Sequence, residues 1–214
     1  MTNWRVQPGR TAEFVQGAAE AKALHERHGA RVFLAQWQNA GARTGLLGYG
    51  MLFTDIQAWG RATDALGGDQ AWLAFVQQRI DAADAGATLV SQSLNSDQPG
   101  FEAAEHPAPG TFILVSSSHL APGRSAEEVL RLAHDWKQAS ADLGAQWMRY
   151  RRTILGGEQS LSFVASYGFA GAASYAAFIA KLAEPARQGL MQASFGPSSP
   201  LVNFSQASGR VLPL

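Results

Sequence analysis

The chain has 214 residues, 46% of them hydrophobic, and 17 basic side chains balance 17 acidic ones. A neutral chain lacks the bulk positive charge that nucleic-acid binding needs, and the absence of cysteine excludes disulfides, thiolate metal sites and cysteine nucleophiles. The apolar content is too high for a disordered chain, but no apolar run is long enough for a membrane span. We therefore expect a folded cytoplasmic protein with no nucleic-acid or membrane partner.

The first half of the chain predicts four strands and two helices. Thr11 stands at the N-cap position of the first helix, and Gly29 is placed to end it. The second helix is expected to break at Gly67-Gly68. In chain order the predicted elements are a strand over 4–7, a helix over 12–28, strands over 31–38 and 46–53, a helix over 56–79 and a strand over 88–94.

The second half predicts the same order of elements. Ser125 is the expected N-cap of its first helix and Gly144 follows that helix, while Pro185 interrupts the second helix. The predicted elements are a strand over 111–120, a helix over 126–143, strands over 146–153 and 161–169, a helix over 172–192 and a strand over 201–207.

An internal repeat relates the two halves. The segment PGRTAEFV at residues 8–15 recurs as PGRSAEEV at residues 122–129, with six of eight positions identical. A Gly-Ala pair follows at residues 29–30 and again at residues 144–145, in the same order along the chain. Collinear matches of this kind predict a tandem duplication.

The repeated order is β-α-β-β-α-β, which is the ferredoxin-like arrangement in the α+β class. Strand 31–38 carries apolar residues on both of its faces, so the sheet face that the helices leave open must also be buried. Two four-stranded antiparallel sheets packed face to face satisfy this requirement. The predicted domains are 1–98 and 110–214. Residues 99–109 are the predicted linker, which contains three prolines.

Several residues carry a resemblance to a known superfamily. Trp37 ends a strand, Gly48-Tyr49 leads into Phe53-Thr54-Asp55, and DQAWLAF occupies residues 69–75. This pattern resembles the NIPSNAP-like branch of the dimeric α+β-barrel superfamily, once per half, although Trp72 has no counterpart in the second half. The resemblance implies a pseudo-dimeric α+β barrel formed by two ferredoxin-like repeats of one chain, acting as a monomer or as a homodimer.

The superfamily includes cofactor-free monooxygenases, haem-binding and haem-degrading proteins, isomerases and proteins of unknown activity. The resemblance therefore implies a small-molecule ligand and a nucleotide-independent enzyme, of monooxygenase, isomerase or cyclase type, acting on an apolar or aromatic substrate. A non-catalytic ligand-binding or haem-binding protein, or a structural or regulatory protein, is the alternative. No nucleotide-binding motif is present. We predict no metal site and no cofactor, with haem left open.

The strand over 146–153 holds the candidate substrate-binding residues. Trp147, Arg149 and Arg151 share one face because side chains alternate along a strand, and Tyr150 lies on the other face. An arginine inside a barrel must be paired or must bind an anion, so this pair of arginines is predicted to hold a carboxylate or an enolate-like substrate. Pairing with a glutamate across the barrel, or exposure at the strand end, is the alternative.

His119 and Tyr167 are the candidate catalytic residues. His119 lies near a strand end, where the repeat pairs it with Arg5, and basic groups at both equivalent positions are expected to border an opening. The alternative is a strand-end residue in water. The aromatic residues Trp37 and Tyr49, together with Trp147 and Tyr150, are expected to line an apolar pocket. Since the arginines occur only in the second half, we expect that pocket to be asymmetric and to draw on that half.

Overall fold

A computed structural model describes residues 1–82, 84–102 and 107–214 of the chain. The elements of the first half are β1 (Thr2–Val6), α1 (Thr11–Arg27), β2 (Arg31–Asn39), β3 (Leu47–Leu52), α2 (Ile56–Gly68), α3 (Gln70–Phe75), β4 (Ala87–Gln92) and β5 (Leu94–Asp97). Those of the second half are β6 (Phe112–Leu120), α4 (Ala126–Asp142), β7 (Trp147–Leu155), β8 (Phe163–Phe169), α5 (Ala172–Leu182), α6 (Gln188–Phe195) and β9 (Leu201–Leu212).

The described strands form one antiparallel sheet in the order β4-β1-β3-β2-β9-β6-β8-β7-β5. Its two ends, β4 and β5, are separated in the chain only by Ser93, so the sheet closes on itself. The Ser93 N–H donates to the carbonyl of Met1 at 2.8 Å, at the junction between β4 and β5. The strand order of the first half, β4-β1-β3-β2, recurs in the second half as β9-β6-β8-β7. This confirms the predicted fold class, two ferredoxin-like repeats in a pseudo-dimeric α+β barrel.

One feature of the sheet differs from the prediction. β9 was predicted to end at residue 207, yet it continues to Leu212, and its last residues pair with β2 of the other half, where Leu34 faces Leu212. In the same way β5 leaves the first half and pairs with β7, where Asp97 faces Arg151. Unpaired strand edges are unfavourable, and this exchange pairs the edges of β2 and β7 that would otherwise be open. The result is one continuous sheet in place of two separate sheets packed face to face.

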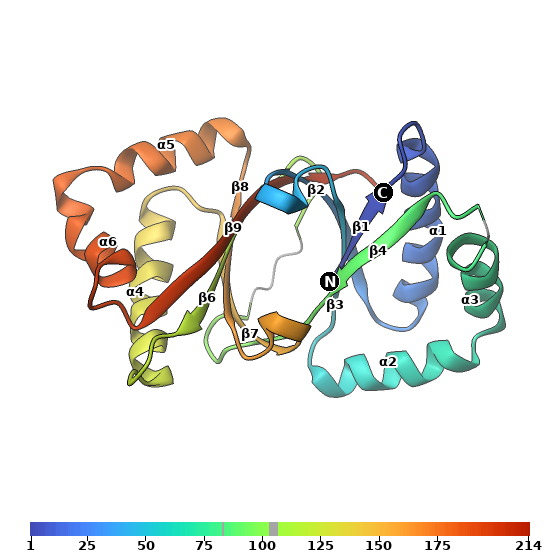
Figure 1. The fold of residues 1–214 in the computed structure, drawn as a ribbon, viewed down its shortest axis with the longest axis horizontal. Helices are drawn as coiled ribbons and strands as arrows, with labels where there is room; N and C mark the ends of the chain where they lie inside the picture. Colours follow the sequence, from blue (N-terminus) through green and yellow to red (C-terminus); the bar gives the residue numbers. More distant parts are fainter. Residues whose placement is uncertain (83, 103–106) are drawn as a thin grey trace.

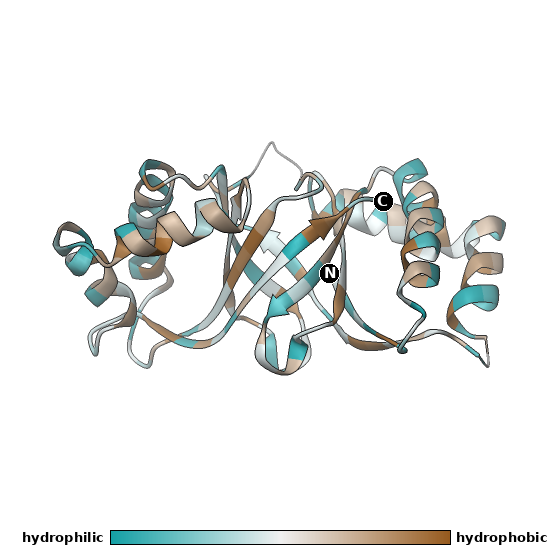
Figure 2. Cartoon of the chain, turned by 90° about the horizontal axis from the view of Figure 1, so that it is seen from above, coloured by the Kyte–Doolittle hydropathy of each residue, from teal (hydrophilic) through white to brown (hydrophobic). Residues whose placement is uncertain are grey.

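The helices cover the outer face of the barrel on two opposite sides, with α1, α2 and α3 on one side and α4, α5 and α6 on the other (Figure 1). Seen from above, the sheet lies between two helical layers, and brown apolar segments alternate with paler ones along its strands (Figure 2). Each helical layer buries its own cluster of apolar side chains against the sheet. Among the described helices, none is both long enough and apolar enough to cross a membrane.

The segment proposed as a linker, 99–109, adds a side chain to the second core. Phe101 is fully buried and its ring packs against Tyr150, with the centroids 5.5 Å apart, and against His134 at 4.6 Å. Residues 103–106 of this segment lie outside the described residues. Through Phe101, the described part of this segment therefore closes the second helical core on the side of β7.

The two equivalent first helices begin differently. Ser125 is the N-cap of α4, as predicted, and forms a capping box in which its hydroxyl accepts from the Glu128 N–H and the Glu128 carboxylate accepts from the Ser125 N–H. The prediction for Thr11 was wrong, because the N-cap of α1 is Arg10 and no side chain caps it. Gly29 and Gly144 follow their helices with φ of 85° and 99°, as expected for glycine at this position.

We predict that Ser125→Ala lowers the free energy of unfolding by about 1 kcal/mol, because it leaves N–H groups of the first helical turn without a partner. The matched substitution Thr11→Ala should have a smaller effect, since the Thr11 side chain does not cap α1. Urea denaturation of both variants measures the difference. Equal losses of unfolding free energy in the two variants would contradict the assignment of Ser125, and not Thr11, as a helix cap.

Candidate functional site

A pocket lies between the helices of the second half and the sheet, and we call it the helix pocket. Its volume is about 220 Å³, and it is bounded by α4, α5 and α6 and by the outer faces of β6, β7, β8 and β9. Its mouth includes Ile179 and Phe195, which are 44% and 49% exposed. The principal lining side chains are Leu114, Ser116, Ser118, Leu132, Ala133, Trp136, Met148, Tyr150, Phe163, Ala165, Tyr167, Tyr175, Phe178, Leu182, Met191, Ser194, Leu201, Asn203 and Gln206.

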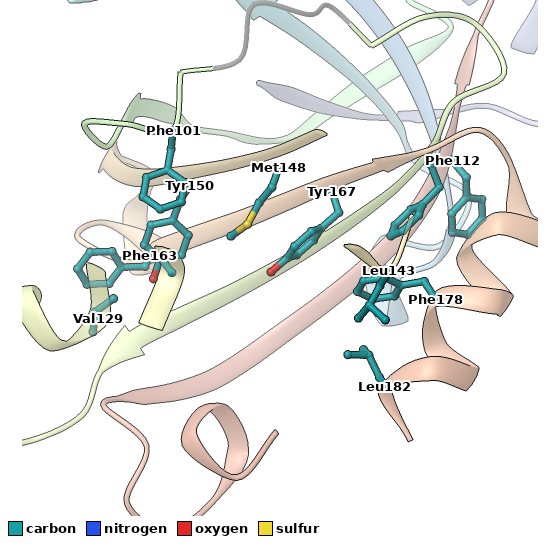
Figure 3. Close-up of a cluster of buried hydrophobic side chains, with 12 residues drawn as sticks. Phe101, Phe112, Val129, Leu143, Met148, Tyr150, Phe163, Tyr167, Phe178 and Leu182 are labelled. Atoms are coloured by element: carbon teal, nitrogen blue, oxygen red, sulfur yellow. The ribbon is translucent and has the colours of Figure 1, made fainter. Parts of the chain in front are cut away.

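Two tyrosines stand on the sheet wall of the helix pocket. Tyr150 of β7 and Tyr167 of β8 project from adjacent strands on the helix side, where Figure 3 shows both rings within the buried cluster. The Tyr150 hydroxyl is buried and has no hydrogen-bond partner among the described residues. Burial raises the pKa of both phenols well above the ordinary value of about 10. They are therefore hydrogen-bond donors in the pocket and do not act as bases.

The lining also carries polar groups of the sheet and of the helices that bond to one another. Asn203 accepts from the Ser118 hydroxyl at 2.5 Å and donates to the Ser194 carbonyl at 3.2 Å. The Trp136 indole N–H donates to the Ser194 hydroxyl at 2.6 Å. The residues that line the pocket include no histidine and no carboxylate. An apolar molecule with one or two oxygen atoms is the kind of ligand that this lining suits.

The first half fills the corresponding space with aromatic side chains. Trp72 of α3 packs edge-on against His25 with centroids 4.6 Å apart, and stacks on Phe75 at 5.5 Å. Tyr49, predicted to bind substrate, lies in this core with its hydroxyl 3.0 Å from Nδ1 of His25, and it borders neither of the two large cavities. The sequence shows that Trp72 has no counterpart in the second half, and the helix pocket lies in that half.

A second and larger cavity, the barrel cavity, occupies the inside of the closed sheet. Its volume is about 710 Å³, and Trp37, Trp147, Arg149 and Arg151 line it. Its walls come from the inner faces of β2, β3, β5, β6, β7 and β8. The predicted alternation along β7 is therefore confirmed. The residues predicted to bind substrate, however, are divided between two cavities, because Tyr150 faces the helix pocket while its neighbours face the barrel.

The two arginines of the barrel cavity are held differently. Arg149, only 8% exposed, donates from Nε to Oδ1 of Asp97 at 3.2 Å and from Nη2 to Oδ2. Arg151 donates from Nη2 to the Ser166 hydroxyl. Loss of hydration, with the nearby charge of Arg149, lowers the pKa of Arg151 to about 10. A glutamate across the barrel was the expected partner of these arginines. The partner is instead Asp97 of β5, which forms an ion pair with Arg149.

The structure places His119 away from both cavities. Its ring stacks on Phe204 of β9 with centroids 4.4 Å apart, and Phe204 is 42% exposed. His119 lines neither the helix pocket nor the barrel cavity. It is therefore not brought together with Tyr167, because it lies near the end of β6 and alternates with Ser118, which faces the helix pocket. The alternative of a basic residue at the strand end agrees better with this position.

The helix pocket does not fit haem. Its volume of about 220 Å³ is below the range of about 300–1,000 Å³ that is typical of ligand and cofactor pockets, and the described residues that line it include no histidine. Over residues 1–82, 84–102 and 107–214, no three or more His, Asp or Glu side chains gather as a metal site would need. We therefore derive no step through haem or a metal ion.

Some residues of these sites were missed in the sequence. Asn203 lies within a predicted strand and Ser194 lies two residues beyond the predicted end of its helix, and only the packing of α6 against β9 brings them to the helix pocket. Asp97 follows the predicted end of its strand by three residues. The sequence offered one signal for a carboxylate such as Asp97, namely the two arginines of one strand face, because a buried arginine requires a carboxylate or a ligand.

Comparisons with known proteins show the fold. No family model and no curated protein sequence matches the chain. A solved structure from Fusobacterium nucleatum, described as a "putative monooxygenase", superposes with a TM-score of 0.60 at 10% identity and covers 99% of this chain and 90% of its own. A protein from Lactobacillus acidophilus with the same description gives a TM-score of 0.52 at 8% identity over 99% and 91%. At such identities the likeness concerns the fold alone.

Proposed function

We propose that the helix pocket binds a small aromatic molecule and that the protein oxygenates it with O₂, as a monooxygenase without a nucleotide cofactor. The observation that carries this proposal is the buried Tyr150 hydroxyl, which has no partner among the described residues, whereas the other polar side chains described above bond to one another. A buried polar group without a partner is costly, so a ligand oxygen that accepts from it gains a favourable bond. The monooxygenase descriptions of the two structural neighbours support the reaction class.

The size of the pocket limits the substrate. An apolar cavity of about 150 Å³ accommodates benzene. A pocket of about 220 Å³ therefore suits one or two fused rings, and the apolar mouth at Ile179 and Phe195 suits their entry. Tyr150 and Tyr167, both protonated, are placed to donate to a phenolate or enolate oxygen of such a molecule.

The lining also limits the chemistry. Since the described lining offers no group that accepts a proton near neutral pH, the substrate must lose its proton to water at the mouth of the pocket, as an acidic phenol or a CH₂ group activated by both a carbonyl and an aromatic ring does. The resulting carbanion reduces O₂, and the balanced overall change is CH₂ to C=O with the second oxygen atom released as water. Isomerisation or cyclisation requires a side chain that moves a proton between two positions, so oxygenation fits this pocket better.

The test uses 1-naphthol and 2-tetralone as probes, with oxygen uptake and incorporation of ¹⁸O from ¹⁸O₂ as readouts. We expect Tyr150→Phe and Tyr167→Phe to lower kcat/KM by about 10-fold or more, because each loses a hydrogen bond to a charged oxygen. Ala165→Phe, which places a ring in the pocket, should abolish turnover. Tyr49→Phe in the first half is the matched control and should leave the rate unchanged.

Two outcomes would count against this function. Binding of the probes in the helix pocket without oxygen uptake would make the protein a non-catalytic ligand-binding protein. Oxygen uptake that survives Ala165→Phe would place the reaction elsewhere. Circular dichroism of each variant separates these outcomes from loss of the fold.

We also propose that the halves, 1–98 and 110–214 joined by 99–109, arose by tandem duplication from a NIPSNAP-like ancestor. The repeated PGR turn and the repeated strand order support a common origin. Because one chain closes the barrel, we propose that it acts as a monomer. Size-exclusion chromatography with light scattering tests this, and a mass near twice 22.8 kDa would favour a homodimer.

A further inference from the structure

We propose that the barrel cavity is a second binding site, separate from the helix pocket, which takes an organic monocarboxylate with an apolar body. Its central feature is the juxtaposition of Arg149 and Arg151 with a single carboxylate, Asp97, inside the closed sheet. This proposal does not depend on the oxygenase function, because the two cavities lie on opposite faces of β7.

The arginines leave one positive charge without a counter-charge. Within the described part of the chain, Arg149 forms an ion pair with Asp97, and Arg151 has no acidic partner. Nη1 of Arg149 and Nε of Arg151 are buried and make no hydrogen bond. Removing a cation from water is costly unless it is paired and its N–H groups are satisfied. A bound anion supplies what this pair lacks.

The walls and the rim narrow the class of anion. Trp37, Trp147 and Ile113 give the cavity apolar surfaces, and the Trp147 ring lies directly over Gly168, where a Cβ atom would be only 2.1 Å from it. The exposed carboxylates of Asp55 and Glu102 lie on the lining and disfavour an ion with several negative charges. One excess cation among apolar walls matches one carboxylate on an apolar body.

A ligand can enter near the start of α2. The lining reaches exposed residues 54–57 there and the exposed Gly157 at the turn between β7 and β8. With a volume of about 710 Å³, the cavity is within the usual range for small-molecule sites. The planar guanidinium group of arginine is the side chain best suited to a carboxylate, which it binds through two parallel hydrogen bonds.

The test is calorimetric titration with 1-naphthoate, its neutral analogue 1-naphthamide and inorganic phosphate. The titrations are repeated with the Ala165→Phe variant, in which the helix pocket is blocked. Binding that remains in this variant belongs to the barrel cavity, so this proposal can be judged separately from the proposed function. We expect naphthoate to bind in both backgrounds. In the Ala165→Phe background naphthamide, which lacks the charge, and phosphate, which lacks the apolar body, should bind at least about 10-fold more weakly than naphthoate. Preferred binding of phosphate would overturn the assignment of the ligand class.

Arg151→Met tests the site itself and should weaken naphthoate binding by about 10-fold or more. Arg152→Gln is the matched control, since Arg152 is exposed on the same strand, lies over the Phe163 ring at 5.6 Å and does not line the barrel cavity. The ligand-free Arg151→Met variant should have a Tm no lower than the parent, because it removes a buried unpaired cation. Unchanged naphthoate affinity, or a lower Tm with no naphthoate binding in the parent, would show that Arg151 is only structural. If Arg151→Met does not fold, Arg151→Gln provides the same comparison.

Discussion

Asp97→Asn will lower the free energy of unfolding by about 3–5 kcal/mol, because it removes one partner of a buried ion pair and leaves the other charged. Asp97 and Arg149 are 20% and 10% exposed and are joined by two hydrogen bonds. Without the carboxylate, Arg149 and Arg151 remain as two like charges inside the barrel. The loss will also weaken the junction where β5 pairs with β7.

Equilibrium denaturation in urea measures this effect. The matched control is Glu127→Gln, which breaks the pair between Glu127 and Arg131 on the surface of α4, where the two side chains are 80% and 64% exposed. Exposed pairs of this kind contribute about 0–1 kcal/mol. If both substitutions cost the same, the barrel pair contributes no more than a surface contact and the electrostatic account of the cavity fails.

Phe178→Ala will destabilise the protein by about 3–5 kcal/mol, the cost typical of removing a large core ring. Phe178 of α5 is 1% exposed and its ring packs against Phe169 at 5.0 Å and against Tyr167 at 6.3 Å. Because the same ring lines the helix pocket, its removal also enlarges the pocket. The variant should therefore bind naphthalene more tightly than the parent does, and naphthalene should recover part of the lost stability.

Phe204→Ala is the control for this result. Phe204 is 42% exposed and stacks on His119 outside both cavities, so its removal should cost about 1 kcal/mol or less. Thermal unfolding with and without naphthalene separates the two roles of Phe178. A variant that loses stability and gains no affinity would show that the helix pocket collapses when a ring is removed.

Strand β7 contributes lining residues to both cavities. Alternate residues of β7 face opposite sides of the sheet, so Tyr150 reaches the helix pocket while Arg149 and Arg151 reach the barrel. A change in the position of this strand affects both sites at once.

The sequence was sufficient for the order of the elements in each half and for most local features, although the N-cap of α1 is Arg10 and not Thr11. Helix caps, such as Ser125, and the face of each β7 residue depend on side chains within a few positions, and such signals are local. The fold class followed from the repeated order of elements. The absence of a second Trp72 indicated in advance that the halves differ, and the helix pocket lies in the half that lacks it.

Only the tertiary structure decided which side chains meet. The exchange of β5 and β9 between the halves brings Asp97 to Arg149, and no periodicity in the sequence indicates that contact. The same closure separates the predicted binding residues into two cavities and leaves His119 outside both. The physical reason is that alternation along a strand determines the face of a side chain, whereas barrel closure and helix packing determine what lies opposite it.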